Sequence, residues 1–201
     1  MTDLISFYYA VDVATDHSWQ VERDENGTIR ADPVRFPGGI KPLVDYANSL
    51  GIEFGIYSAQ KEFTCQRRPG SYLHEAQDVQ TYCDWGVSYI KLDQCAGAHY
   101  TELNVSWIKF RKAIDDCVAQ RGKPMVLSVE SCDDPNSCGK WIGKLANLWR
   151  TSGDIQATFA SVMSNAASNT RMAALAGPTG GPVAGGGGHW NDADMLQVRK
   201  Q

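Results

Sequence analysis

Apolar residues recur along the chain in two kinds of pattern, short continuous runs and longer stretches with helical spacing. The short runs predict strands over residues 4–12, 51–58, 87–93, 124–130 and 148–151. Apolar residues at intervals of three and four predict helices over residues 40–49, 73–85, 102–118, 139–145 and 155–167. Strands that alternate with helices in this way are typical of parallel βα units, so the pattern predicts an α/β fold.

Three segments fall outside this alternation. Residues 15–30 are polar, and we expect a long loop there with a turn at Asn26-Gly27. Residues 172–177 are a candidate for one further strand. Residues 177–188 hold too many glycines for a regular element, so we expect a flexible loop; without Gly-Lys-Ser/Thr and a following helix it does not resemble a phosphate-binding loop. Five or six strands are fewer than a barrel of eight needs, since that fold typically takes about 250 residues.

The strand predicted over residues 87–93 ends in two charged residues that share a face. Lys91 and Asp93 are two positions apart and should point the same way, while Ile90 and Leu92 point to the opposite face. Chemistry in α/β barrels and open α/β sheets is placed at the C-terminal ends of the strands. Beside the ammonium group of Lys91, we expect the Asp93 carboxylate to be ionised and available as a nucleophile. The alternative is a surface ion pair at a strand end.

Acidic residues collect at or after the ends of the predicted strands. The set is Asp12, Asp93, Glu130, Asp154, Asp192 and Asp194. Because parallel strands end on one side of a sheet, we expect these carboxylates to line one cleft, although any single one could be a helix cap. Carboxylates with Trp and Tyr nearby suit carbohydrate, and cleavage of a glycosidic bond needs one ionised and one protonated carboxyl group. Asp93 fits the ionised partner, and Asp154 is the candidate for the protonated one, because like charges repel.

Composition and charge exclude several classes of partner. The net charge of -4 gives no basic footprint, so nucleic acid is not an expected partner. No apolar run approaches the roughly 18 residues of a membrane span, and none follows a basic N-terminus as in a signal peptide. We therefore expect no membrane partner.

The six cysteines favour an oxidising compartment. Cys132 and Cys138 are close enough in sequence to close a small loop, and the sequons at Asn26 and Asn104 point the same way. We expect the full-length protein to be secreted or to reside in a lysosome-like or vacuole-like compartment. Zinc bound by thiolates is not expected, since the chain has no Cys-x-x-Cys pair and its four His are scattered.

Several motifs, taken together, resemble the family 27 glycoside hydrolases, the α-galactosidases or melibiases. The most specific are Lys-Leu-Asp-Gln-Cys at residues 91–95 and Arg-Thr-Ser-Gly-Asp-Ile at residues 150–155. Similar motifs occupy residues 23–27, 31–33, 35–40, 54–58, 64–65, 68–71, 84–87 and 188–196. The resemblance covers nearly the whole chain, in order.

The resemblance implies a (β/α)8 TIM-type barrel, of which residues 1–201 would be a partial catalytic domain with about strands two to seven. The first and last strands and a C-terminal β-domain would lie outside. It also implies release of terminal α-linked galactose with retention, with Asp93 as nucleophile and Asp154 as acid/base. The implied substrate contacts are Asp12, Tyr57, Lys91, Glu130, Arg150 and Asp194. No cofactor and no metal are implied, and a homodimer stays open for the full-length protein.

The resemblance further implies a disulfide between Cys65 and Cys95, which would hold Asp93 from its far side. Proximity suggests that Cys132 pairs with Cys138, which leaves Cys83 and Cys117. The connectivity of these four cysteines stays open.

Two departures from the family pattern bear on sugar specificity. The family usually has Asp-Asp-Cys-Trp after the second strand, whereas here Val13 follows Asp12, and Asp16 or Trp19 are candidates to compensate. Ser131 and Cys132 follow Glu130 where the family has an aromatic residue. The alternatives are therefore an enzyme for α-N-acetylgalactosaminides or β-L-arabinopyranosides, and a non-catalytic sugar-binding barrel remnant. A third alternative is a metal enzyme that uses His189, Asp192 and Asp194.

Overall fold

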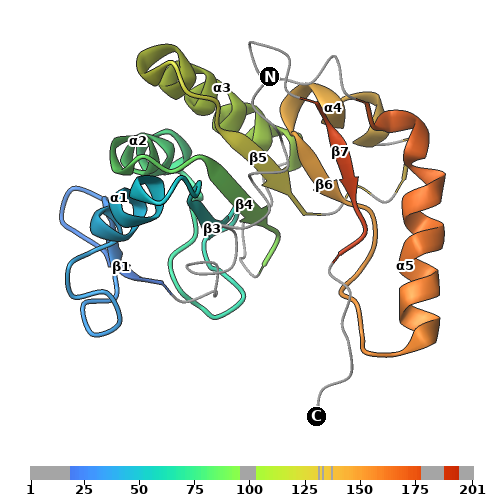
Figure 1. Cartoon of the computed structure of the whole chain (residues 1–201), viewed down its shortest axis with the longest axis horizontal. Helices are drawn as coiled ribbons and strands as arrows, with labels where there is room; N and C mark the ends of the chain where they lie inside the picture. The colour runs from blue at the N-terminus through green and yellow to red at the C-terminus, as the bar shows by residue number, and fades with distance from the viewer. Residues whose placement is uncertain are drawn as a thin grey trace. The chain divides into compact units, whose positions relative to one another are not determined.

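The computed structural model in Figure 1 describes residues 19–95, 103–130, 132, 134–136, 138–177 and 188–194, with the side chains of 103 and 104 left aside. The chain divides into two compact units, Met1–Val126 and Leu127–Gln201, and each is described by itself. The strand predicted over residues 4–12, which includes Asp12, lies outside the described residues. So does most of the glycine-rich loop, at residues 178–187.

The described part of the first unit begins with an antiparallel hairpin of β1 (Gln20–Arg23) and β2 (Ile29–Ala31). The turn predicted at Asn26-Gly27 is confirmed: Gly27 has a φ of 81°, which a residue without Cβ adopts freely. The prediction of a loop throughout this segment is wrong. Strands of four and three residues with exposed charged side chains, such as Glu22 and Arg30, are too short and too polar to show an apolar alternation.

Strand and helix then alternate as predicted. The elements are α1 (Lys41–Ser49), β3 (Gly55–Ala59), α2 (Glu75–Trp85), β4 (Tyr89–Asp93) and α3 (Leu103–Arg121). Strands β3 and β4 pair in parallel, with Gly55 opposite Tyr89 and Ala59 opposite Asp93. Strand β3 begins four residues later than expected, because the N–H groups of Gly51 and Ile52 bond back to the end of α1.

Helices α2 and α3 pack against each other in the first unit (Figure 1). The predicted apolar face of α3 is confirmed at Trp107, Phe110 and Ile114, whose side chains are fully buried. A disulfide between Cys83 and Cys117 links the two helices covalently. The core of this unit therefore lies between the parallel strands and this pair of helices.

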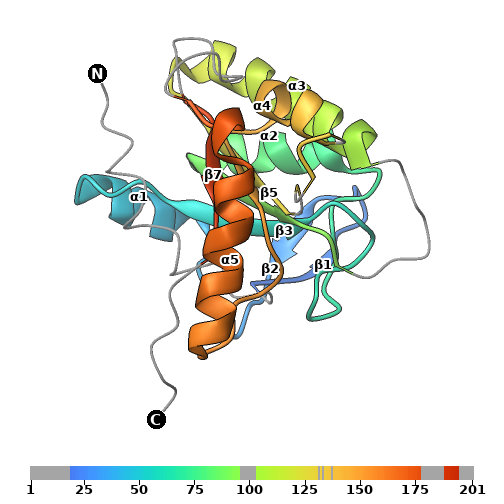
Figure 2. The same ribbon diagram turned by 90° about the vertical axis from the view of Figure 1, so that its right-hand side faces the viewer.

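The second unit repeats the alternation on a smaller scale. Its elements are β5 (Val126–Val129, which begins at the last residue of the first unit), a 3₁₀ helix η2 (Cys138–Lys140), α4 (Ile142–Leu145), β6 (Leu148–Arg150), α5 (Phe159–Arg171), a 3₁₀ helix η3 (Ala173–Leu175) and β7 (Trp190–Asp192). Strand β6 pairs in parallel with both β5 and β7. Helix α5 lies beside β7 (Figure 2). These parallel strands with intervening helices are those of a partial (β/α)8 barrel.

Two expectations for the second unit are wrong. The strand expected over residues 172–177 is mostly the 3₁₀ helix η3, and a single antiparallel bridge joins Gly177 to His189. The strand that follows is β7, which has only three residues, all half-buried. Its sequence contains no apolar run long enough to predict a strand. The helix expected over residues 155–167 is α5, which begins four residues later, at Phe159, because the Thr158 side chain accepts the N–H of Ser161 as an N-cap.

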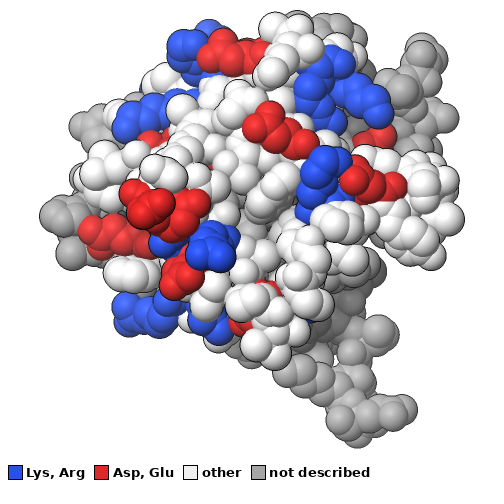
Figure 3. All heavy atoms as spheres, turned by 90° about the vertical axis from the view of Figure 1, so that its left-hand side faces the viewer, with Lys and Arg blue, Asp and Glu red and all other residues white. Residues whose placement is uncertain are grey.

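Charged side chains of both signs are intermixed on the face of the molecule that Figure 3 shows. Among the described residues, ion pairs one helical turn apart join Lys41 with Asp45 and Lys112 with Asp116. Among the helices in the described part of the chain, none is long and apolar enough to cross a bilayer.

Candidate active site

Asp93 is the last residue of β4, and the predicted alternation of that strand is confirmed. Ile90 and Leu92 are fully buried, whereas Lys91 and Asp93 are partly exposed on the other face. The amine and the carboxylate therefore leave the strand on the side where solvent or substrate can reach them.

Both carboxylate oxygens of Asp93 accept hydrogen bonds. The hydroxyl of Tyr57, a buried residue of β3, donates to Oδ2 at 2.5 Å. The backbone N–H of Gln94 donates to Oδ1 at 2.6 Å. Hydrogen bonds to an ionised acceptor are short and strong, so these two donors fix the orientation of the carboxylate.

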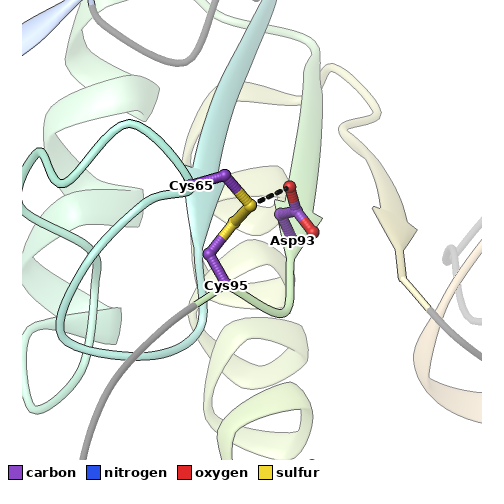
Figure 4. A group of neighbouring side chains, drawn as sticks. All are labelled: Cys65, Asp93 and Cys95. Carbon is purple, nitrogen blue, oxygen red and sulfur yellow. Dashed lines mark hydrogen bonds between the residues drawn. A yellow bond between two sulfur atoms is a disulfide. The ribbon is translucent and has the colours of Figure 1, made fainter. Parts of the chain in front are cut away.

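A disulfide lies against this carboxylate. Cys65 and Cys95 are bonded to each other, the pairing that the resemblance implied, and Sγ of Cys65 lies 3.5 Å from Oδ2 of Asp93 (Figure 4). A disulfide sulfur has no proton to donate, so we interpret this as a packing contact. Sγ of Cys95 lies 3.2 Å from the hydroxyl of Tyr57, so the disulfide borders both partners of the hydrogen bond.

Cys65, Asp93 and Cys95 form a group whose candidate metal-ligand atoms all lie within 4.8 Å of one another. Metals bind cysteine as the thiolate. In Cys65 and Cys95 the sulfurs are bonded to each other, so neither offers that ligand while the disulfide is intact. The group therefore serves to pack Asp93 rather than to chelate.

The loop that carries Cys65 is a tight hairpin. Phe63 and Pro69 form an antiparallel bridge, and Thr64 donates its N–H to the carbonyl of Arg68 at 2.8 Å. At Gly70 a Cβ would lie 2.0 Å from the carbonyl oxygen of Lys61, so only glycine fits. This backbone holds Cys65 in place for its bond to Cys95.

In the second unit, Arg150 gathers the acidic residues. It ends β6, and its guanidinium forms ion pairs with Glu130 at 3.3 Å, Asp154 at 3.2 Å and Asp194 at 3.1 Å. Burial alone would lower the pKa of Arg150, but the carboxylates of Glu130, Asp194 and Asp192 outweigh it and raise the pKa. Arg150 is therefore a permanent cation among predicted site residues.

The two acidic residues on loops differ in exposure. The Asp154 side chain is 93% exposed, whereas that of Asp194 is 12% exposed and accepts the N–H of Ile155 at 2.8 Å. Asp194 also has a φ of 73°, in the left-handed region that residues with a Cβ rarely adopt. Asp154 is thus open to a ligand, while Asp194 is held in a specific backbone conformation.

Other candidates have structural roles. Trp19, considered as a replacement for the missing sugar-binding carboxylate, is fully buried; its indole N–H donates to the Tyr57 carbonyl at 2.7 Å, and its ring packs against Tyr82 and Trp85. That expectation is wrong, because an indole enclosed in the core cannot meet a sugar. Asp16, the other candidate, lies outside the described residues, as does Ser131.

The residues of the metal alternative also have partners within the protein. The ring of His189 stacks on Trp149 with centroids 6.0 Å apart. Oδ1 of Asp192 accepts the N–H of Asp194 at 2.8 Å. Among the described residues, the ligand atoms of His189, Asp192 and Asp194 do not form a group close enough to hold a metal ion.

Sequence reasoning missed one residue that contacts these loops, Asn165 of α5. It is buried, and its Nδ2 donates to the carbonyls of Gly153 and Ala193 at 3.2 Å each. The sequence contains no clear signal for it, because the apolar residues Phe159 and Met163 suggest another inward face for this helix, and the structure exposes both of them. A polar residue at a buried helical position often bonds to a neighbouring loop.

Comparison with known proteins shows which family the chain belongs to. The sequence model of one family, Melibiase_2, described as "Alpha galactosidase A", matches residues 6–200. The chain belongs to the melibiase family. Its members are glycoside hydrolases, and the match extends through both units and all described parts of the site.

Individual melibiases agree with this assignment. Alpha-galactosidase A of Cellvibrio japonicus is 37% identical over 188 residues, which cover 91% of this chain and 44% of that protein. Human alpha-N-acetylgalactosaminidase is 35% identical, with 91% of this chain and 44% of that protein covered. The structure of the α-galactosidase of Saccharomyces cerevisiae has a TM-score of 0.76 at 27% identity, over 95% of this chain and 45% of that one. The chain thus spans less than half the length of the curated relatives that it matches.

Proposed function

We propose that residues 1–201 are part of the catalytic barrel of a retaining glycoside hydrolase that releases terminal α-linked galactose. The observation that carries this proposal is the fixed carboxylate of Asp93, with donors on both oxygens, in a chain that matches the melibiase family over residues 6–200. A carboxylate held in one orientation at the end of a parallel strand suits a nucleophile that must attack along a defined line.

In the first step of the proposed reaction, the Asp93 carboxylate attacks the anomeric carbon of galactose. The bond from that carbon to the leaving oxygen breaks, and the carboxylic acid of Asp154 donates its proton to that oxygen. The products are a galactosyl ester on Asp93, the free alcohol and an ionised Asp154. The high exposure of Asp154 supports this role, because an acid must reach the leaving group of a bound substrate.

In the second step, Asp154 takes a proton from water, and the water oxygen attacks the anomeric carbon. The ester bond breaks, galactose leaves, and Asp93 returns to the carboxylate. We assign sugar-binding roles to Asp12, Tyr57, Lys91, Glu130, Arg150 and Asp194. The buried network of Arg150 supports this assignment, since a cation and its carboxylates offer fixed donors and acceptors to sugar hydroxyls.

An oxidising compartment fits the full-length protein best. All six cysteines form disulfides, Cys65–Cys95, Cys83–Cys117 and Cys132–Cys138. Such bonds persist outside the cytosol. We therefore propose secretion or residence in a lysosome-like or vacuole-like compartment.

The test is hydrolysis of 4-nitrophenyl α-D-galactopyranoside by the full-length protein and by Asp93→Asn. We expect the variant to lose about a thousand-fold or more in kcat, because an amide cannot form the ester intermediate. Asp84→Asn, the same change at an exposed carboxylate of α2, is the matched control and should keep wild-type activity. Activity that is unchanged in Asp93→Asn would contradict the proposed nucleophile.

A second candidate substrate is an α-N-acetylgalactosaminide, because one relative at 35% identity is named for that activity. Assays of nitrophenyl α-galactoside, α-N-acetylgalactosaminide and β-L-arabinopyranoside with the same protein separate these specificities. The highest kcat/KM on α-galactoside supports the proposal. Binding of galactose in a calorimeter without turnover of any of the three would instead favour a non-catalytic sugar-binding barrel.

A further inference from the structure

Two loops of the second unit carry site residues, and one side chain holds both. Asp154 follows β6 and Asp194 follows β7, and α5 lies beside β7 (Figure 1). From α5, the Nδ2 atom of Asn165 donates one hydrogen bond to the Gly153 carbonyl and another to the Ala193 carbonyl, each at 3.2 Å. These are the residues immediately before Asp154 and Asp194.

The position of Asp154 depends on its backbone. Its side chain is 93% exposed, and within the described residues its one recorded side-chain bond is to Arg150 Nη2 at 3.2 Å. At Gly153, the space that a Cβ would occupy has no neighbour within 4 Å, so this position has no side-chain packing. The hydrogen bond from Asn165 is therefore a main restraint on the peptide from which Asp154 extends.

The second loop needs a restraint for a different reason. Asp194 occupies the left-handed region at φ 73°, which persists only where the surroundings enforce it. The Ala193 carbonyl is fixed by Asn165, the Asp194 N–H by Asp192 Oδ1 at 2.8 Å, and the Asp194 carboxylate by Ile155 N–H. In the strained peptide between Ala193 and Asp194, the carbonyl thus bonds to Asn165 and the N–H bonds to Asp192.

A second asparagine one turn later strengthens the arrangement. Asn169 Oδ1 accepts the hydroxyl of Thr151 at 3.2 Å, and the Asn169 carbonyl accepts Nδ2 of Asn191 at 3.3 Å. The spacing of four residues places Asn165 and Asn169 on one face of α5. This face therefore bonds to both loops through polar groups, in addition to its packing.

We propose that Asn165 is a positioning residue that sets the acid/base Asp154 and the sugar-binding Asp194 relative to each other. This inference rests on the proposed function, since it assigns Asn165 to the geometry of that reaction. Two hydrogen bonds from one buried nitrogen couple the loops, so a change at Asn165 should reach Asp154 without touching substrate.

The test is Asn165→Leu in the full-length protein, because leucine has a similar size and no donor. A misplaced acid slows a poor leaving group more than a good one, since only the poor one needs its proton. We expect kcat/KM to fall about ten-fold or more for methyl α-galactoside, and by no more than about three-fold for 2,4-dinitrophenyl α-galactoside.

Azide gives a second readout. With the dinitrophenyl substrate, the second step needs Asp154 as base for water, whereas azide attacks the galactosyl ester without a base and releases Asp93 as the carboxylate. Azide should therefore raise kcat of Asn165→Leu and yield α-galactosyl azide, with no comparable effect on wild type. A residue that only stabilises α5 would change neither the leaving-group dependence nor the response to azide.

Asn48→Leu, the same change at an exposed position of α1, is the matched control and should behave as wild type. If Asn165→Leu fails to accumulate, Asn165→Asp keeps the shape, removes both donors, and is assayed in the same way. An equal fall for both substrates without an azide effect, or no fall at all, overturns the role of Asn165 while the proposed function stands. A wild-type protein that hydrolyses neither substrate overturns the proposed function and this role with it.

Discussion

Arg150 shows how one buried cation can organise several acidic side chains. Its side chain is only 8% exposed, which is unusual for arginine. Carboxylate oxygens of three acidic residues lie within 3.3 Å of its guanidinium nitrogens. A guanidinium suits this position better than an ammonium, because its planar fork presents separate N–H groups to separate acceptors. Without Arg150, Glu130 and Asp194 would each lose a cationic partner in a largely buried place.

We therefore predict that Arg150→Ala lowers the free energy of unfolding of the full-length protein by about 3 kcal/mol, measured by urea denaturation. Arg150→Lys should recover part of this loss, since it restores the charge but not the fork. Lys41→Ala removes an exposed ion pair with Asp45 and should cost no more than about 0.5 kcal/mol. Equal losses of unfolding free energy in Arg150→Ala and Lys41→Ala would show that the buried Arg150 network stabilises the protein no more than an exposed ion pair does.

The placement of some candidate residues could be predicted from sequence, and that of others could not. Lys91 and Asp93 follow from strand periodicity alone, since a two-residue repeat fixes their shared face. The burial of Trp19 could not be foreseen, because the partners of its indole, at Tyr57, Tyr82 and Trp85, are distant in sequence. Contacts between distant residues are set by tertiary packing, and a local pattern does not contain them.

At the scale of elements, the disulfide between Cys83 and Cys117 closes a long loop through α2, β4 and α3, with a sequence separation of 34. Cys132 and Cys138 are separated by only 6 residues. A cross-link stabilises by restricting the unfolded chain, and this effect grows with the length of the closed loop.

We predict that Cys83→Ala with Cys117→Ala lowers the free energy of unfolding by about 4 kcal/mol, and Cys132→Ala with Cys138→Ala by about 2 kcal/mol. Calorimetric melting of both double variants of the full-length protein, with wild type under the same conditions, gives the comparison. A smaller loss in the variant that opens the longer loop would be inconsistent with this entropic account.

The strength of the local pattern decided which elements could be predicted. Helix α3 repeats its apolar face over 19 residues, so its existence and orientation were evident. Strand β7 and the hairpin strands β1 and β2 have three or four residues each. Such short segments show no clear apolar pattern, and pairing with neighbouring strands makes them extended. The short apolar run over residues 172–177 fits either a strand or a helix, and the structure has a 3₁₀ helix at Ala173–Leu175.

At the scale of the whole molecule, the proposed chemistry needs a carboxyl group from each unit. Asp93 belongs to the first unit and Asp154 to the second, so neither unit alone has both groups. In parallel strand–helix repeats, each strand ends in a loop that can bear one functional residue, as with Asp93 at the end of β4 and Asp154 after β6.

This division of roles makes a stereochemical prediction for the full-length protein. If Asp93 forms an ester and water then displaces it, the anomeric carbon is inverted twice and the first product is α-galactose. Proton NMR in D2O during hydrolysis of 4-nitrophenyl α-galactoside should show the α-anomer first, with the β-anomer appearing only as fast as free galactose mutarotates. A sample of α-galactose without enzyme supplies that rate. If β-galactose formed first, water would attack directly, Asp93 would act as a base instead of a nucleophile, and the azide response expected of Asn165→Leu would have no ester to act on.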